Sequence, residues 1–141
     1  MLRGIAPIIN PDLLSVLYRM GHGDEIILAD AHFPVETFGQ RVVRCDGISI
    51  NQILDGLMPL FTLDQYDDEK VMMMEVVPGD TGDPSVEAGY REIIEKHETD
   101  FEVKRIERFA FYERAKQAFC IVTTGDTKKY GNLILKKGVI Q

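Results

Sequence analysis

The sequence predicts an α/β sandwich with a largely parallel sheet, formed by one domain that spans residues 1–141. Helical patterning alternates with short apolar runs for most of the length, which is typical of strands joined by helical crossovers. No linker, internal repeat or low-complexity segment interrupts the 141 residues, and this length suits one domain with its own core.

We expect the following elements in chain order: helix 11–20, strand 25–29, loop 31–40, strand 41–44, helix 50–60, strand 71–77, loop 78–84, helix 84–96, strand 101–106, helix 108–117, strand 118–123, turn 125–129 and strand 132–135.

Capping residues mark the starts of the predicted helices. In the first helix, Asn10 can cap, Pro11 suits the first position, and an apolar stripe follows. Ser49 or Asn51 can cap the second helix, and Asp83-Pro84 can open the third. The fourth helix is predicted from near-helical spacing of its aromatic residues.

Apolar runs predict the strands. The most apolar run, 71–77, contains Met72-Met73-Met74, which we interpret as core. The run over 25–29 is short and rich in Ile and Leu, as in a buried strand. Pro34 and Gly39 predict a loop over 31–40, and the Pro- and Gly-rich stretch 78–84 predicts another.

Composition and charge restrict the classes of function. The net charge of −7 argues against a basic nucleic-acid surface, an anionic membrane surface or a polyanionic substrate, and leaves a neutral small molecule open. Cys45 and Cys120 are too few for a disulfide framework and are expected to be buried free thiols. No apolar run could span a bilayer and no signal peptide is evident, so we expect a cytoplasmic protein.

Titratable residues concentrate around the first predicted strand. His22 lies between two glycines at a helix-to-strand junction, and an imidazole can exchange a proton near neutral pH. Asp30 follows the same strand at its carboxyl end, where α/β proteins bind ligands. Its carboxylate can accept hydrogen bonds from sugar-like hydroxyls, or it can simply form an Asx turn.

A metal site formed by His22, Asp24, Asp30 and His32 is a weaker interpretation. His22 and Asp30 bracket a strand, which would separate them by roughly 20 Å at about 3.3 Å per residue. One metal cannot bridge that distance in one subunit. For the same reason the two residues share a small ligand only if the chain bends or if a site forms between subunits.

Two further segments carry aromatic and polar side chains together. Residues 105–114 interleave arginines with aromatics, and we expect Arg108 and Tyr112 to share a helix face. Phe109 and Phe111 are easily explained as core, whereas the hydroxyl of Tyr112 needs a partner if it is buried. Tyr130 and Asn132 alternate onto one face around a glycine. Aromatic faces pack against sugar rings, and such polar groups reach their oxygens.

Several motifs in order resemble the ribose pyranase and L-fucose mutarotase family: Met20-Gly21-His22-Gly23-Asp24-Glu25, Asp30-Ala31-His32-Phe33-Pro34, Arg108-Phe109-Ala110-Phe111-Tyr112-Glu113-Arg114-Ala115 and Tyr130-Gly131-Asn132-Leu133 with the residues that follow to Gly138. The resemblance runs from end to end and is weakest over 79–103. The segments around Tyr112 and Tyr130 resemble the fucose branch more closely.

The resemblance implies a three-layer α/β/α sandwich, assembled into ring-like homo-oligomers (decamers in the family) with sites near subunit contacts. It also implies an isomerase that interconverts the anomers of a free monosaccharide, L-fucose, without a cofactor or metal. Nucleic acid and membrane are not implied as partners.

The resemblance also assigns roles to individual residues. It implies that His22 is the proton donor and that Tyr112 and Tyr130 are tyrosines of the fucose branch, one of which pairs with His22 in catalysis. The residues implied to bind substrate are Asp30, Asp64, Arg108 and Asn132.

Three alternatives remain open from the sequence. They are a pyranase that acts on D-ribose, a sugar-binding protein without catalytic activity, and a metal-dependent lyase or hydrolase.

Overall fold

The computed structural model describes all residues 1–141 and contains a six-stranded sheet of order β2-β5-β1-β6-β3-β4. The helices and strands, in chain order, are α1 (Pro11–Arg19), β1 (Glu25–Ala29), α2 (Val35–Phe38), β2 (Val42–Arg44), α3 (Ile50–Leu57), the 3₁₀ turn η1 (Met58–Leu60), β3 (Val71–Met74), α4 (Pro84–Glu95), β4 (Val103–Ile106), α5 (Arg108–Gln117), β5 (Cys120–Thr123) and β6 (Leu133–Lys136). Only β6 runs against its neighbours β1 and β3, and the other pairs are parallel. The largely parallel sheet is therefore confirmed.

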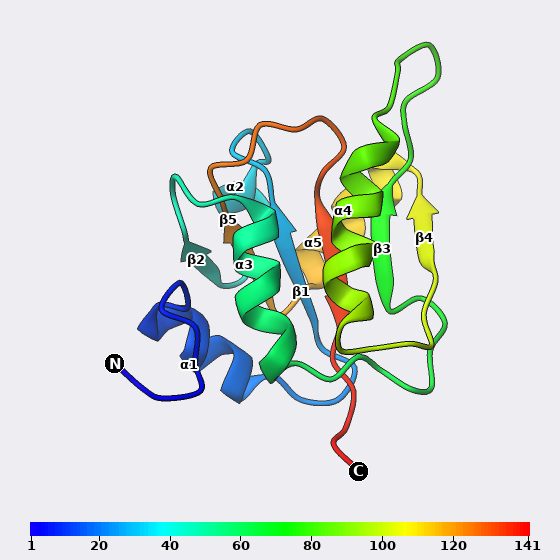
Figure 1. Ribbon diagram of the computed structural model, residues 1–141. Coiled ribbons are helices and arrows are strands. Elements are labelled where there is room, and N and C mark those ends of the chain that lie inside the picture. Colours follow the sequence, from blue (N-terminus) through cyan, green and yellow to red (C-terminus); the bar gives the residue numbers. More distant parts are fainter.

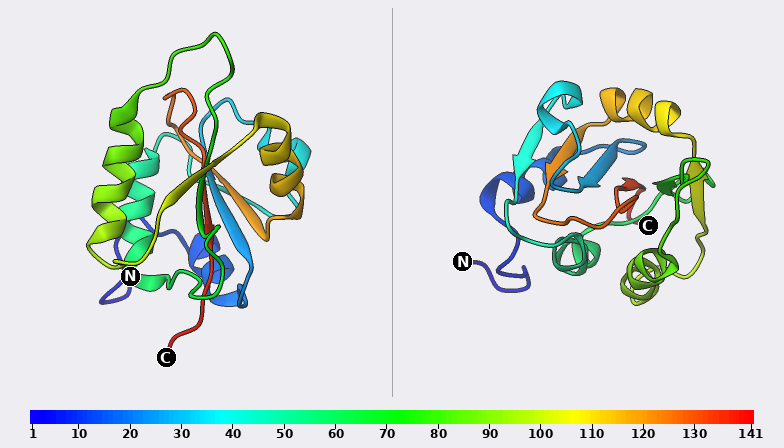
Figure 2. Two further views of the ribbon diagram at one scale, coloured as in Figure 1. Left: turned by 90° about the vertical axis from the view of Figure 1, so that its right-hand side faces the viewer. Right: turned by 90° about the horizontal axis from the view of Figure 1, so that it is seen from above.

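Helices cover both faces of the sheet, as the view from above shows (Figure 2). One core cluster joins α1, α3 and α4 to one face, and a second joins α2 and α5 to the other. Adjacent strand residues such as Ile26 and Ile27 belong to opposite clusters, because successive side chains of a strand point to opposite faces. The three-layer sandwich implied by the resemblance is therefore observed.

The parallel strands point towards the top of Figure 1, so their carboxyl ends lie there with the loop between β3 and α4. The amino end of β1, α1 and both chain termini lie at the lower end. None of the helices combines the length and the apolar character that crossing a bilayer requires.

Capping explains where the helices begin. Asn10 accepts a hydrogen bond from the Leu13 amide, and Asp83 accepts one from Ser85. Of the two candidate caps for α3, Ser49 is the one used, in a capping box with Gln52. The helix ends at Leu57 and tightens into η1, because Pro59 has no amide hydrogen to continue it.

Several element boundaries differ from the prediction by one or two residues, and two differences are larger. The expected loop 31–40 contains the single turn α2, which Pro34 and Gly39 flank and which packs Val35 into the core. The strand expected over 71–77 ends at Met74. Its partner β4 ends at Ile106 so that α5 can begin, and residues beyond Glu75 then have no strand to pair with.

Candidate active site

A depression of about 310 Å³ at the carboxyl end of the parallel strands collects most of the predicted site residues. It lies where ligands bind in open α/β sheets. The predicted residues that line it, which we call the carboxyl-end group, are Asp30, Arg108, Tyr112, Tyr130 and Asn132. His32 also lines it.

Asp30 and Asn132 are held together across the sheet. The Asp30 amide donates to Oδ1 of Asn132 at 2.7 Å. Oδ1 of Asp30 accepts from the amides of His32 and Phe33, each at 2.8 Å. The Asx turn considered as an alternative is therefore present, and it fixes the direction of the carboxylate at the edge of the depression.

Tyr130 has an unusual backbone conformation, with φ of 56°. Its hydroxyl donates to Oδ2 of Asp80 at 2.6 Å. That bond is the main reason why the pKa of Asp80 falls to about 2, and it also raises the pKa of the Tyr130 phenol. Asp80 lies 50 residues away in the loop before α4, and nothing in the sequence indicated this contact.

Tyr90 of α4 supports the same segment from inside the core. The side chain is fully buried, and its hydroxyl donates to the carbonyl oxygen of Gly131 at 2.7 Å. Gly131 lies between Tyr130 and Asn132, so this bond fixes the backbone that carries both. The sequence holds one indication of this contact, because a tyrosine on an apolar helix face needs a partner for its hydroxyl.

Arg108 and Tyr112 lie on the first turns of α5. Glu107 caps this helix through the amides of Phe109 and Ala110. The Arg108 guanidinium lies 4.6 Å from the centre of the Phe109 ring, and Tyr112 packs against Phe33 and Phe38. The core prediction is confirmed for Phe111, which is fully buried, and is wrong for Phe109, which is 61% exposed.

His22 and Asp64 form a separate pair at the other end of the sheet. Nε2 of His22 lies 3.1 Å from Oδ1 of Asp64, and the imidazole is 45% exposed while the carboxylate is 5% exposed. Burial raises the pKa of Asp64, but hydrogen bonds from the Tyr66 amide and from His22 outweigh it, so the pKa lies below its ordinary value. An ionised Asp64 can only accept. Nε2 of His22 therefore carries a hydrogen, and Nδ1 remains free for proton transfer.

The single chain does not bring the His22–Asp64 pair and the carboxyl-end group together. His22 precedes β1 and Asp30 follows it, as expected for residues that bracket an extended strand. No three His, Cys, Asp or Glu side chains anywhere in the chain converge as a metal site would require.

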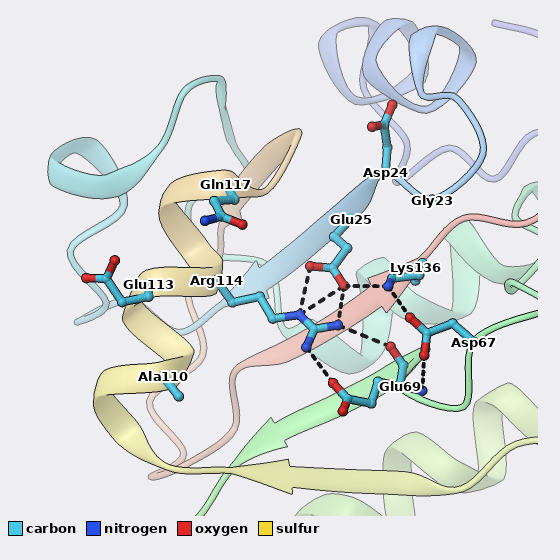
Figure 3. A pocket seen from close by; sticks show the side chains of 10 residues that line it. All are labelled: Gly23, Asp24, Glu25, Asp67, Glu69, Ala110, Glu113, Arg114, Gln117 and Lys136. Atoms are coloured by element: carbon cyan, nitrogen blue, oxygen red, sulfur yellow. Dashed lines mark hydrogen bonds and ion pairs between the residues drawn. The ribbon is translucent and has the colours of Figure 1, made fainter.

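A strongly polar cavity of about 640 Å³ lies between the amino end of β1 and the last turns of α5 (Figure 3). Arg114 bonds Glu25 at 2.7 Å and Glu69 at 2.7 Å. Lys136 bonds Asp67 and lies 3.7 Å from Glu25. These five side chains, which we call the ionic network, satisfy one another. They join α5, β1, β6 and the segment that follows Asp64.

The sequence matches the model of the RbsD / FucU transport protein family over residues 3–140. The chain belongs to this family. The family that the sequence motifs indicated is therefore confirmed.

Curated and solved members of the family are similar over nearly the whole chain. An L-fucose mutarotase of Histophilus somni (strain 2336) is 54% identical over 140 residues, which cover 99% of this chain and 97% of that protein. The crystal structure of the fucose mutarotase of Streptococcus pneumoniae in complex with L-fucose has a TM-score of 0.94 at 46% identity, covering 99% of this chain and all of that one.

A more distant solved structure shares the fold. The structure of Bacillus subtilis RbsD complexed with D-ribose has a TM-score of 0.78 at 21% identity, with complete coverage of both chains. At this identity the similarity establishes the fold alone.

Proposed function

We propose that this protein is an L-fucose mutarotase, an isomerase that interconverts the α and β anomers of free L-fucose. The observation that carries this conclusion is the 54% identity to an L-fucose mutarotase over almost the full length of both chains. The fucose-bound structure of a relative with nearly the same fold supports the same ligand.

The depression at the carboxyl end suits a neutral monosaccharide. It offers a carboxylate from Asp30, an amide from Asn132 and a guanidinium from Arg108, which together can donate to and accept from hydroxyl groups. Tyr112 and Phe33 add aromatic surface for the apolar side of a sugar ring. A few polar groups on a partly apolar wall are typical of sites that orient a small ligand.

Mutarotation requires two proton transfers. One group removes the proton from the anomeric hydroxyl while another protonates the ring oxygen, so the bond between the anomeric carbon and the ring oxygen breaks and an open-chain aldehyde forms. The aldehyde rotates, and reclosure with the roles reversed gives the other anomer. His22 supplies one of these groups through Nδ1, and Tyr112 or Tyr130 supplies the other. Side chains perform all of these steps, so the reaction calls for no cofactor.

Because His22 lies apart from the carboxyl-end group within one chain, we propose that the site is shared between subunits. These subunits form a ring-shaped homo-oligomer, a decamer as in the family. The half-exposed imidazole of His22 supports this arrangement, because it can reach beyond its own chain. Exposed Met1, Leu2, Tyr18 and Ile140 form apolar surface around α1 and the termini, at the same end of the molecule as His22. Surface of this kind marks contact sites.

The chain acts as one domain over 1–141, in the cytoplasm. Two buried free cysteines, Cys45 and Cys120, fit a reducing compartment.

Saturation-transfer NMR on an equilibrium mixture of L-fucose anomers tests the proposal. We expect the protein to accelerate exchange between the two anomeric signals. D-ribose is the comparison sugar, and faster exchange of ribose than of fucose would instead favour a pyranase. A folded sample that binds L-fucose without accelerating exchange would be a sugar-binding protein.

A further inference from the structure

Asp80 is the one carboxylate that bonds a proposed catalytic phenol. It projects from the loop between β3 and α4, and its Oδ2 accepts from the Tyr130 hydroxyl at 2.6 Å. Its Oδ1 lies 3.0 Å from Nζ of Lys129 and accepts from the Thr81 amide at 2.8 Å. The carboxylate is therefore held on both oxygens, although its side chain is still 34% exposed.

The backbone of Tyr130 indicates that the position of its side chain matters. A bulky residue with φ of 56° is an outlier, and such strain persists only where neighbouring groups enforce it. Tyr90 bonds the next residue from the core, and Asp80 bonds the hydroxyl from the loop. Tyr130 is thus held through the backbone beside it by Tyr90 and through its hydroxyl by Asp80.

The direction of the Asp80 bond determines what Tyr130 can do. Hydrogen bonds from Tyr130 and Lys129 keep Asp80 ionised, with a pKa of about 2. An ionised carboxylate only accepts, and a phenol has a single hydrogen to donate. Because the phenol donates that hydrogen to Asp80, the oxygen of Tyr130 can offer a ligand only a hydrogen-bond acceptor. Of the two phenols that line the depression, only Tyr130 is bonded within the chain in this way.

We propose that Asp80 is a positioning residue that holds Tyr130 as a hydrogen-bond acceptor for a sugar hydroxyl. Tyr130 then binds the sugar, and Tyr112 is the phenol that exchanges a proton with it. This inference rests on the proposed mutarotase function, and it separates the roles of the two tyrosines, which the sequence left open.

A double-mutant cycle tests the proposal, using Asp80→Ala, Tyr130→Phe and the double variant. The dissociation constant for L-fucose is measured by calorimetry, and the exchange rate at saturating sugar by NMR. We expect each single variant to weaken binding about 3- to 10-fold, the effect of one hydrogen bond. The double variant should bind as Tyr130→Phe does, because Asp80 acts only through Tyr130. Any loss of exchange at saturating sugar in Tyr130→Phe should stay far below the roughly 10²-fold loss expected when a proton donor is removed.

Two further variants keep the test specific. Asp80→Asn retains an acceptor but can also donate, so its affinity should lie between those of the wild type and Asp80→Ala. Asp100→Ala removes an exposed carboxylate that precedes β4, at the amino end of the parallel strands and outside the lining of the depression, and it should bind L-fucose as the wild type does. Melting temperatures check that each variant is folded.

Three results would overturn the proposal. They are unchanged affinity in Asp80→Ala, additive losses in the double variant, or a loss of saturating exchange of about 10²-fold in Tyr130→Phe, as expected for a proton donor. A wild type that binds L-fucose without accelerating exchange would reject the mutarotase function instead. The binding cycle would still decide the role of Asp80.

Discussion

At the residue scale, the proposed chemistry of His22 depends on Asp64. The carboxylate is almost fully buried and bonds both the imidazole and the Tyr66 amide. It selects the ring tautomer with hydrogen on Nε2, and a fixed tautomer is what a proton-transferring histidine needs. We therefore propose that Asp64 acts through His22 as a positioning residue, while the contact with the sugar that the resemblance implies stays a prediction.

Replacing Asp64 with Asn should lower the exchange rate at saturating L-fucose on the order of 10²-fold, because an amide can donate as well as accept and no longer selects one tautomer. Affinity for L-fucose should change little. Exchange NMR and calorimetry measure the two quantities, and Asp55→Asn, an exposed aspartate near Lys96, is the control. A wild-type rate in the folded Asp64→Asn variant would show that His22 does not depend on this bond.

At the element scale, long-range side-chain contacts fix helix ends and strands that the local sequence leaves free. Asp126 is buried, and its Oδ2 accepts from the Ile50 amide at the start of α3 while Oδ1 accepts from the Lys128 amide. Burial raises the pKa of Asp126, but these bonds and Lys128 outweigh it and lower the pKa below its ordinary value. The ionised form is therefore favoured in the folded state.

The stability contributed by Asp126 should depend on pH. A carboxyl whose folded pKa is depressed stabilises the fold above its unfolded pKa of about 3.9 and loses that contribution as pH falls further. Asp126→Asn should be about 1–2 kcal/mol less stable at pH 7, and the gap should narrow below about pH 4. Urea unfolding at pH 7, 5 and 3, at one protein concentration, measures this. A gap that stays constant over this range would contradict the assignment.

The ionic network around Arg114 joins four elements, and its cations each contact two carboxylates. Arg114→Met should destabilise the protein by about 3 kcal/mol, because Glu25 is only 11% exposed and loses its closest partner. Arg91→Met, which removes a more exposed pair with Glu87 on α4, should cost less than about 1 kcal/mol. Urea unfolding at pH 7 compares the variants, and equal losses would mean that the network adds no specific stability.

At the scale of the whole molecule, β1 separates His22 from the carboxyl-end group. The site that we propose therefore combines two copies of the chain, with His22 from one and the carboxyl-end group from the other. The acceptor and donor groups for the sugar would then be divided between subunits.

Mixing two inactive variants tests this division. His22→Ala and Asn132→Ala should each exchange L-fucose anomers slowly, whereas subunits mixed under dissociating conditions and reassembled should regain part of the wild-type rate. Some subunit contacts in the mixed oligomer then join an intact His22 of one subunit to an intact Asn132 of the next. Light scattering measures the assembly, and reassembled single variants are the controls. A mixture no faster than its components would place the whole site within one subunit.

Much of the fold follows from local patterns in the sequence. Caps predicted α1 and α4, near-helical spacing predicted α5, and apolar runs predicted the succession of strands along the chain, because these signals act over a few residues. The short helix α2 and the early end of β3 were missed. Both depend on what lies beside them: α2 on the core contact of Val35, and β3 on the length of its partner β4.

The sequence by itself determined the family, the α/β layers, and the residue types that we propose for a sugar site, since motifs and periodicity are properties of neighbouring positions. Only the tertiary structure decided that His22 pairs with Asp64, that Asp80 accepts a hydrogen bond from Tyr130, and that Tyr90 supports Gly131. These partners lie 41 to 50 residues apart. Their contacts arise because the sheet and its helices bring segments that are distant in the sequence together at both ends of the strands, which no local pattern encodes.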